Sequence, residues 1–262
     1  RSDSGRGLPA CHNRRMAGHS KWKNIRIRKG KQDALRGKLF TKLSREIIVA
    51  ARSGGGDPAT NSRLRVAIEK ARENSLPADN IDRAVQRGTG KIEGADYEEL
   101  VYEGYGPGGS ALMVEVFSEN KNRTVADLRH AFSKCGGNLS ENGSVGWQFK
   151  HVGQITVPRN GQDEDEFTLA ALDAGADDVQ SDEDYFTVET PIEGLHKTND
   201  ALEKAGYRAE EVGLARIPTN MANPDLDDLR KLVRLLDMLE DLDDVKETFV
   251  NVEIPEDVLQ EA

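Results

Sequence analysis

The sequence has little cysteine and no long hydrophobic run. Its 262 residues include only two cysteines, Cys11 and Cys135, which form neither a metal-ligand spacing nor a disulfide pattern and suit a reducing compartment. The longest apolar stretches, such as SALMVEVFS and REIIVAA, are far shorter than the roughly 20 residues of a membrane-spanning helix. We therefore expect a cytoplasmic protein without a membrane partner.

Motifs for catalysis or cofactor binding are also scarce. YEGYGPGG precedes a strand rather than a helix, so it predicts a turn, and GTGK is followed by Ile92 instead of the Ser or Thr of a phosphate loop. The acidic runs at 163–166 and 182–184 lack the alternating spacing of a calcium loop. We expect no enzyme, no cofactor and no metal. The alternative is an unrecognised site beside the glycine-rich loop and the segment 120–123.

Two single residues with chemical potential, His130 and Cys135, give no site. They are five positions apart on one expected helix and so lie on different faces. Residues 1–15 lack the apolar core of a signal peptide. We interpret them as an upstream extension or an expression scar, with a transit peptide as the alternative, because Met16 opens a stretch of different character.

Charge is divided unevenly along the chain, whose net charge is −10. Residues 1–92 hold 22 Lys and Arg against 8 Asp and Glu, a net of +14, whereas residues 93–262 hold 14 against 38, a net of −24. A basic module beside an acidic remainder indicates a polyanionic partner. The alternative is that the two halves attract one another.

The basic module has the periodicity of three short helices. Leu35, Leu39, Leu43 and Ile47 repeat every four residues, and the glycines at 54–56 end this helix. Two further helices are expected over 62–74 and 77–88. Lys38, Lys42 and Arg45 are then expected to face outward. The segment 18–31 has no apolar stripe and is expected to be an arm beside the bundle.

Strands and helices alternate in the remainder. SALMVEVFS and SVGWQFK are expected strands on either side of a helix that begins at Thr124, with Asp127 completing a capping box. A β-α-β-β-α-β order follows from Gly153, and a helix over 226–242 precedes the closing strand TFVNVEIP. These patterns predict an α+β protein. Its expected domains are helical 16–92, split α/β 93–152 with 219–262, and inserted ferredoxin-like 153–218.

Several segments together resemble the YebC/PmpR family. They include MAGHSKWKNIRIRKGKQDALRGKLFTKL, LPADNIDRAV, YEGYGPGG and NKNRTVADLRHAFSKCGGNLSENGSVGWQF, and the similarity runs in order from Met16 to the C-terminus. The resemblance implies a helical N-terminal domain, two α/β domains and no known catalytic activity. It also implies either a DNA-binding transcriptional regulator or, as for the mitochondrial activator of cytochrome oxidase subunit one synthesis, support of translation through difficult stretches. The first fifteen residues and Lys23 depart from the family pattern.

Composition and resemblance favour nucleic acid as the partner, with ribosomal RNA preferred over DNA because no expected helix is rich in base-reading side chains. Trp22 would stack on a base or, as the alternative, fill the wall of the bundle. The oligomeric state stays open. The expected nucleic-acid-binding residues are Lys21, Trp22, Lys23, Arg26, Arg28, Lys29, Lys31, Lys38, Lys42 and Arg45.

Overall fold

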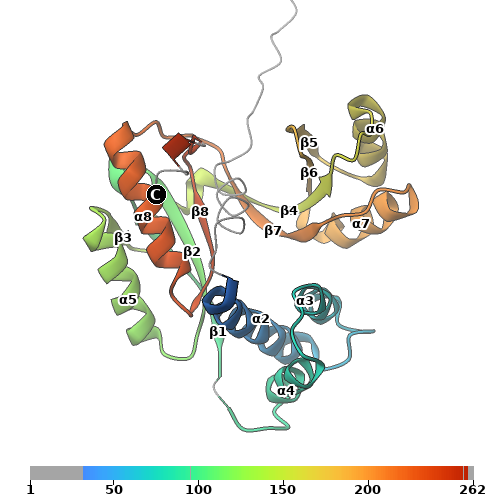
Figure 1. Ribbon diagram of the computed structural model, residues 1–262, viewed down its shortest axis with the longest axis horizontal. Coiled ribbons are helices and arrows are strands. Elements are labelled where there is room, and N and C mark those ends of the chain that lie inside the picture. Colours follow the sequence, from blue (N-terminus) through green and yellow to red (C-terminus); the bar gives the residue numbers. More distant parts are fainter. Residues whose placement is uncertain (1–31, 95, 256, 259–262) are drawn as a thin grey trace, which may run out of the picture. The chain divides into compact units, whose positions relative to one another are not determined.

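The computed structural model describes residues 32–94, 96–255 and 257–258 (Figure 1). The chain forms two compact units. The smaller one, called the inserted unit here, has Gly153–Gly213 as its described part, and the larger unit contains the described residues before and after it. Helices come first and two four-stranded sheets follow, which confirms the α+β class.

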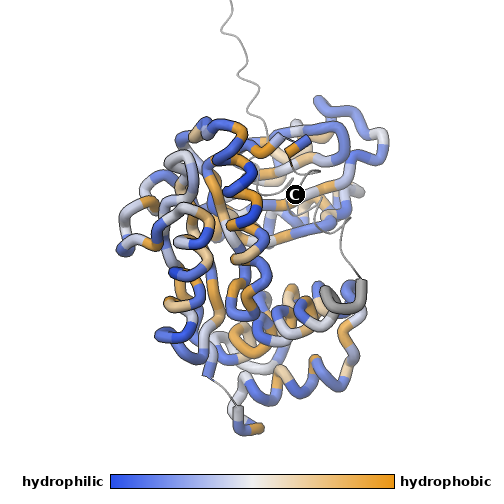
Figure 2. The backbone as a smooth tube through the Cα atoms, turned by 60° about the vertical axis from the view of Figure 1, so that its left-hand side comes forward, coloured by the Kyte–Doolittle hydropathy of each residue, from blue (hydrophilic) through white to orange (hydrophobic). Residues whose placement is uncertain are grey.

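Three helices begin the larger unit: α2 (Gln32–Gly54), α3 (Ser62–Glu73) and α4 (Ala78–Gly88). Hydrophobic and hydrophilic positions alternate along the helices (Figure 2), and the buried ones, among them Ile47 and Leu64, share one core. Asn61 joins two of the helices. Its side chain accepts from the Leu64 amide as the N-cap of α3 and donates to the carbonyl of Ala50 on α2 at 2.8 Å. The periodicity therefore placed these helices correctly.

The first sheet has the order β3-β1-β2-β8 and contains β1 (Glu98–Tyr105), β2 (Ala111–Ser118), β3 (Asn138–Ser140) and β8 (Val245–Val250). All its neighbouring strands pair antiparallel. The helices α5 (Lys121–Lys134) and α8 (Leu226–Glu240) share a hydrophobic core with β2 and β8 that includes Val114, Phe132 and Leu236. This core brings the end of α8 close to the start of α5.

Three local expectations differ from the structure. The stretch read as a turn is a strand up to Tyr105, and only Gly106–Gly109 turns, because pairing with β2 overrides the glycines. The helix α5 starts at Lys121 with Asn120 as N-cap, so the capping box expected at Thr124 is wrong. SVGWQFK is not one strand, since a short 3-10 helix, Gly146–Gln148, precedes β4 (Phe149–Pro158).

The second sheet has the order β5-β6-β4-β7 and follows the expected β-α-β-β-α-β sequence. Its further elements are α6 (Glu164–Ala174), β5 (Asp178–Ser181), β6 (Tyr185–Thr190), α7 (Leu195–Lys204) and β7 (Glu211–Pro218). This strand order is that of a ferredoxin-like fold. Phe167 stacks on Phe186 with ring centroids 4.0 Å apart, and Tyr207 meets Phe167 edge-on at 4.9 Å. The strands β4 and β7 carry the chain into and out of this unit.

Candidate nucleic-acid interface

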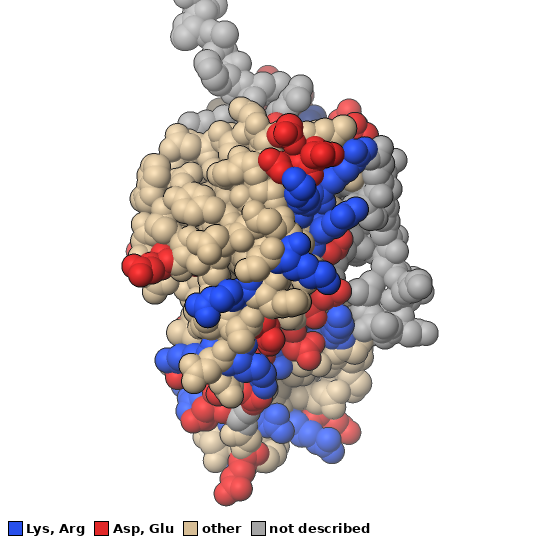
Figure 3. Space-filling model, turned by 90° about the vertical axis from the view of Figure 1, so that its left-hand side faces the viewer, with Lys and Arg blue, Asp and Glu red and all other residues tan. Residues whose placement is uncertain are grey.

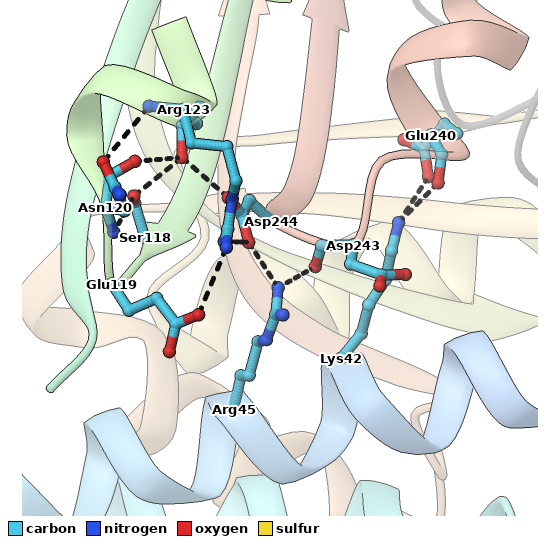
Figure 4. A network of polar contacts seen from close by, with 10 residues as sticks. Lys42, Arg45, Ser118, Glu119, Asn120, Arg123, Glu240, Asp243 and Asp244 are labelled. Carbon is cyan, nitrogen blue, oxygen red and sulfur yellow. Dashed lines mark hydrogen bonds and ion pairs between the residues drawn. The ribbon is translucent and has the colours of Figure 1, made fainter. Parts of the chain in front are cut away.

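The expected cationic face of α2 lies against the end of α8. Lys42 Nζ donates to the carbonyl oxygen of Glu240 at 2.8 Å, and Lys38 Nζ donates to that of Asp241 at 3.3 Å. Each lysine also pairs with the carboxylate of the same residue, at 3.4 and 3.1 Å. Figure 4 shows Lys42 rising from α2 towards Glu240. Both lysines therefore bind within the protein.

These contacts act as a helix cap supplied by another helix. The last carbonyls of an α-helix have no partner inside the helix, and its C-terminal end carries partial negative charge. The last turn of α8 contains no basic residue of its own. Lys38 and Lys42 supply both the missing donors and the positive charge.

Arg45 is buried, so the expectation that it faces outward is wrong. The residue is 9% exposed, and its guanidinium donates to the carbonyl of Asp243 and to the carboxylate of Asp244, the latter at 2.9 Å. The ring of Tyr97 lies 5.1 Å from the guanidinium carbon. Arg45 could reach a phosphate only by giving up these contacts.

The two lysines make the same kind of contact but differ in burial, so their alanine variants can be compared directly. Lys42→Ala is expected to lower the free energy of unfolding by about 1 kcal/mol, because a half-buried ammonium loses a carbonyl and a carboxylate. Lys38→Ala is expected to change it by less than about 0.5 kcal/mol, because that pair is exposed to solvent. Urea unfolding of both variants measures the difference. Equal losses in the two variants would show that the greater burial of the Lys42 contacts does not strengthen them.

Asp244 is the centre of a polar network that joins α2, α5 and the loop before β8 (Figure 4). Its carboxylate accepts from Arg45, from Arg123 at 3.1 Å and from the hydroxyl of Thr124 at 2.7 Å. Ser118 Oγ lies 2.7 Å from the Thr124 hydroxyl, which can accept from it. Asp244 is only 7% exposed. One carboxylate thus fixes the N-terminal helices to the first sheet.

A hollow of about 430 Å³ opens beside this network. More carboxylates than cations line it, namely Glu119, Asp127, Asp241, Asp243 and Asp244 against Lys38, Arg45 and Arg123. This balance does not favour a phosphate group. The glycine-rich loop, expected to line any catalytic pocket, is not among its lining residues.

Ion pairs also cross the sheet away from the hollow. Lys246 on β8 pairs with Glu99 at 3.4 Å and with Glu115 at 3.1 Å. Glu99 in turn holds Arg63 of α3 at 2.9 Å, and Glu115 holds Arg216 at 3.0 Å. Burial alone would lower the pKa of Lys246, but the surrounding carboxylates, Glu115 foremost, outweigh it and raise that pKa. Another cation of the basic module, Arg63, is therefore used internally.

Other arginines of the helices stay exposed. Arg65 and Arg72 lie seven positions apart on α3, and Arg83 and Arg87 lie four apart on α4, so each pair shares a helix face. Within the described ranges, none of the four forms an ion pair. These four arginines were not among the expected binding residues, although their exposure follows from the helical period. The expected binding residues at 21–31 lie outside the described residues.

The described part of the chain offers no other candidate centre of chemistry. No group of three or more His, Cys, Asp or Glu is placed there to hold a metal ion. His130 on α5 is exposed, and Cys135, the C-cap of that helix, is buried. Burial also raises the pKa of the Cys135 thiol. Among these same residues, no helix is long and apolar enough to cross a membrane.

Comparison with known proteins covers nearly the whole chain. Residues 20–91 match the N-terminal domain of the TACO1/YebC protein, and residues 97–252 match the TACO1/YebC second and third domain. A probable transcriptional regulatory protein of Chlorobaculum tepidum is 51% identical over 93% of this chain and 98% of its own. One from Pseudomonas fluorescens is 54% identical over 93% and 98%.

A solved structure agrees with the fold. The crystal structure of a conserved hypothetical protein from Aquifex aeolicus matches with a TM-score of 0.79 and 44% identity, and it covers 85% of this chain and 92% of that one. The sequence matches and the shared architecture lead to one conclusion: the chain belongs to the TACO1/YebC family.

Proposed function

We propose that the protein is a non-enzymatic, nucleic-acid-binding regulator of gene expression that associates with the ribosome and contacts ribosomal RNA. The observation that carries this proposal is the net charge of +14 over residues 1–92 in a chain of net charge −10. Lys38, Lys42 and Arg45 of α2 already pair with carboxylates of the protein itself. We therefore assign nucleic-acid binding to the basic segment 21–31 and to the exposed arginines of α3 and α4. Support of elongation through difficult stretches is the function that the family resemblance suggests.

Binding to duplex DNA is the second candidate. It is favoured by the names of the relatives, which are probable transcriptional regulatory proteins. A DNA reader places side chains from one helix on base edges in the major groove. No helix of the sequence is expected to be rich in such base-reading side chains, and this is the reason for preferring RNA.

Sedimentation of the purified protein with ribosomes at moderate salt tests the proposal directly. Co-sedimentation, together with tighter binding to ribosomal RNA than to random duplex DNA, is expected. Binding that is specific for one DNA sequence and absent from ribosomes would instead establish the transcriptional role. Failure to bind either nucleic acid would refute both candidates.

The basic segment allows a sharper measurement. Lys23→Ala is expected to flatten the log–log salt dependence of RNA binding by about 0.7 to 0.9, because one phosphate contact and its released counterions are lost. Trp22→Ala is expected to weaken binding by roughly 1 to 3 kcal/mol with the salt slope unchanged, because a stacked ring is uncharged.

The same two variants also test the alternative place for Trp22. If the ring filled the wall of the helical bundle, Trp22→Ala would lower the stability by about 3 to 5 kcal/mol and affect binding only indirectly. Thermal melting of each variant separates these cases. Unchanged RNA and ribosome affinity in both folded variants would show that the segment 21–31 serves another purpose.

A further inference from the structure

Trp147 is unusually exposed for its size. Its side chain is 68% exposed, the largest fraction among the exposed large hydrophobic residues described. The indole Nε1 donates to the carbonyl oxygen of Ser144 at 3.1 Å, and the hydroxyl of Tyr105, itself 38% exposed, donates to the same oxygen at 3.0 Å. The polar edges of both rings are thus satisfied inside the protein. The faces of the two rings are what remains available to a partner.

The turn that carries Trp147 is anchored to β1. The carboxylate of Glu103 on β1 accepts three backbone amides, from Gly143 at 2.8 Å and from Val145 and Gly146 at 2.7 Å. Val145 is fully buried in a small hydrophobic core. A ring fixed in this way loses little conformational entropy when it binds a partner.

The stretches of chain that carry the two rings or lie beside them are nearly free of charge. Residues 104–114 and 217–224 contain no charged residue, and residues 136–148 contain only Glu141, in a chain that is 31% charged. These stretches meet in space, because Tyr105 pairs with Asn138 and the Thr219 amide donates to the Gln148 carbonyl at 2.7 Å. Figure 3, which views the side of the molecule that carries β3, shows a broad area without Lys, Arg, Asp or Glu.

Uncharged hydrogen-bonding side chains, including the exposed Asn142 and Asn220, stand on these stretches. An unpaired base is itself neutral, stacks on aromatic rings and hydrogen-bonds through its edge. A protein partner would normally use the N–H of a tryptophan and the O–H of a tyrosine, but here both are already donated to Ser144. Duplex DNA keeps its bases stacked inside the helix and cannot offer a face.

We propose that Trp147 and Tyr105 form a stacking platform for an unpaired nucleobase of RNA. The inference rests on the proposed function and adds a second contact to it. The basic N-terminal segment binds phosphates, and this neutral platform binds a base. Binding at the platform should therefore depend on bases and on single strands, whereas binding at the segment should depend on salt.

The experiment uses the full chain with Trp22→Phe, which leaves Trp147 as the remaining one of two tryptophans. Single-stranded RNA of about twelve nucleotides is expected to quench its fluorescence, and an abasic ribose-phosphate strand of equal length is not. Trp147→Ala is expected to weaken RNA binding about 5- to 150-fold with the salt slope unchanged, which corresponds to the loss of one stacked base. Trp147→Phe should retain most of the affinity, and Leu169→Ala, which removes an apolar residue of similar exposure (65%) on α6, should retain all of it.

Several results would overturn the platform. If Trp147→Ala binds RNA normally and RNA does not quench the fluorescence of the Trp22→Phe protein, the platform is refuted and the proposed function stands. If Trp147→Ala loses ribosome binding but keeps its affinity for RNA, Trp147 contacts a protein partner. If the wild-type chain is a dimer that dissociates in Trp147→Ala, Trp147 contacts a second copy of the chain. A wild-type chain that binds no RNA would refute both the platform and the proposed function.

Discussion

Replacing Asp244 with alanine is expected to lower the free energy of unfolding by about 3 to 5 kcal/mol. The carboxylate is almost fully buried and accepts from Arg45, Arg123 and Thr124. Its removal leaves the buried guanidinium of Arg45 with one partner fewer, and breaking a buried ion pair from one side costs an amount of this order. Denaturant unfolding followed by circular dichroism measures the loss.

Two variants keep this result interpretable. Asp244→Asn retains an acceptor oxygen and is expected to lower the free energy of unfolding by less than Asp244→Ala, because it can still accept from Thr124. Asp241→Ala removes an exposed carboxylate from the same loop and should change the stability by less than about 0.5 kcal/mol. If Asp244→Ala were no worse than Asp241→Ala, the polar network would not be what holds the helices to the sheet.

Glu103→Gln is expected to lower the stability by about 2 to 4 kcal/mol at neutral pH. A neutral amide offers one acceptor oxygen to three backbone donors, and it loses the charge that strengthens these bonds. Burial alone would raise the pKa of Glu103, but the three backbone amides outweigh it and hold that pKa below its ordinary value of 4.5.

The direction of this shift fixes the pH dependence. A carboxylate whose pKa is lowered by folding stabilises the protein fully above its unfolded pKa, and this contribution disappears as the pH falls through the lower folded value. The stability difference between the wild-type chain and Glu103→Gln should therefore be constant near neutral pH and shrink below about pH 4.5. Glu141→Gln, in the same turn but exposed, is the control and should change the stability by less than about 0.5 kcal/mol at neutral pH. A difference that grows on acidification would contradict the assignment.

Much of the fold could be predicted because its signals are local. The apolar period that includes Leu43 and Ile47 places α2, and the β-α-β-β-α-β order places the second sheet. The strand β1 was missed because its last four residues contain two tyrosines and a glycine before a glycine-rich turn, a composition that also suits a loop. Pairing with β2 along its whole length decides the outcome.

The roles of single charged residues could not be predicted, since their partners are remote in sequence. Arg45 looks like an exposed cation of an amphipathic helix, but the residue that buries it lies 199 positions away. The role of Glu103 is not marked by any partner side chain in the sequence, because its partners are backbone amides of a turn about 40 residues later. Spatial neighbours of this kind follow only from the tertiary structure.

The place of β8 at the end of the chain has a consequence for synthesis. It pairs with β2, yet residues 118 and 245 are separated by the whole inserted unit and by α8. At roughly 5 to 20 residues per second, a nascent chain waits about 6 to 25 seconds between completing β2 and making its partner. Throughout that interval β2, buried at every position in the finished protein, has an open edge. A factor that shelters nascent chains, or a pause that lengthens the wait, would therefore affect the time for which this edge stays unpaired.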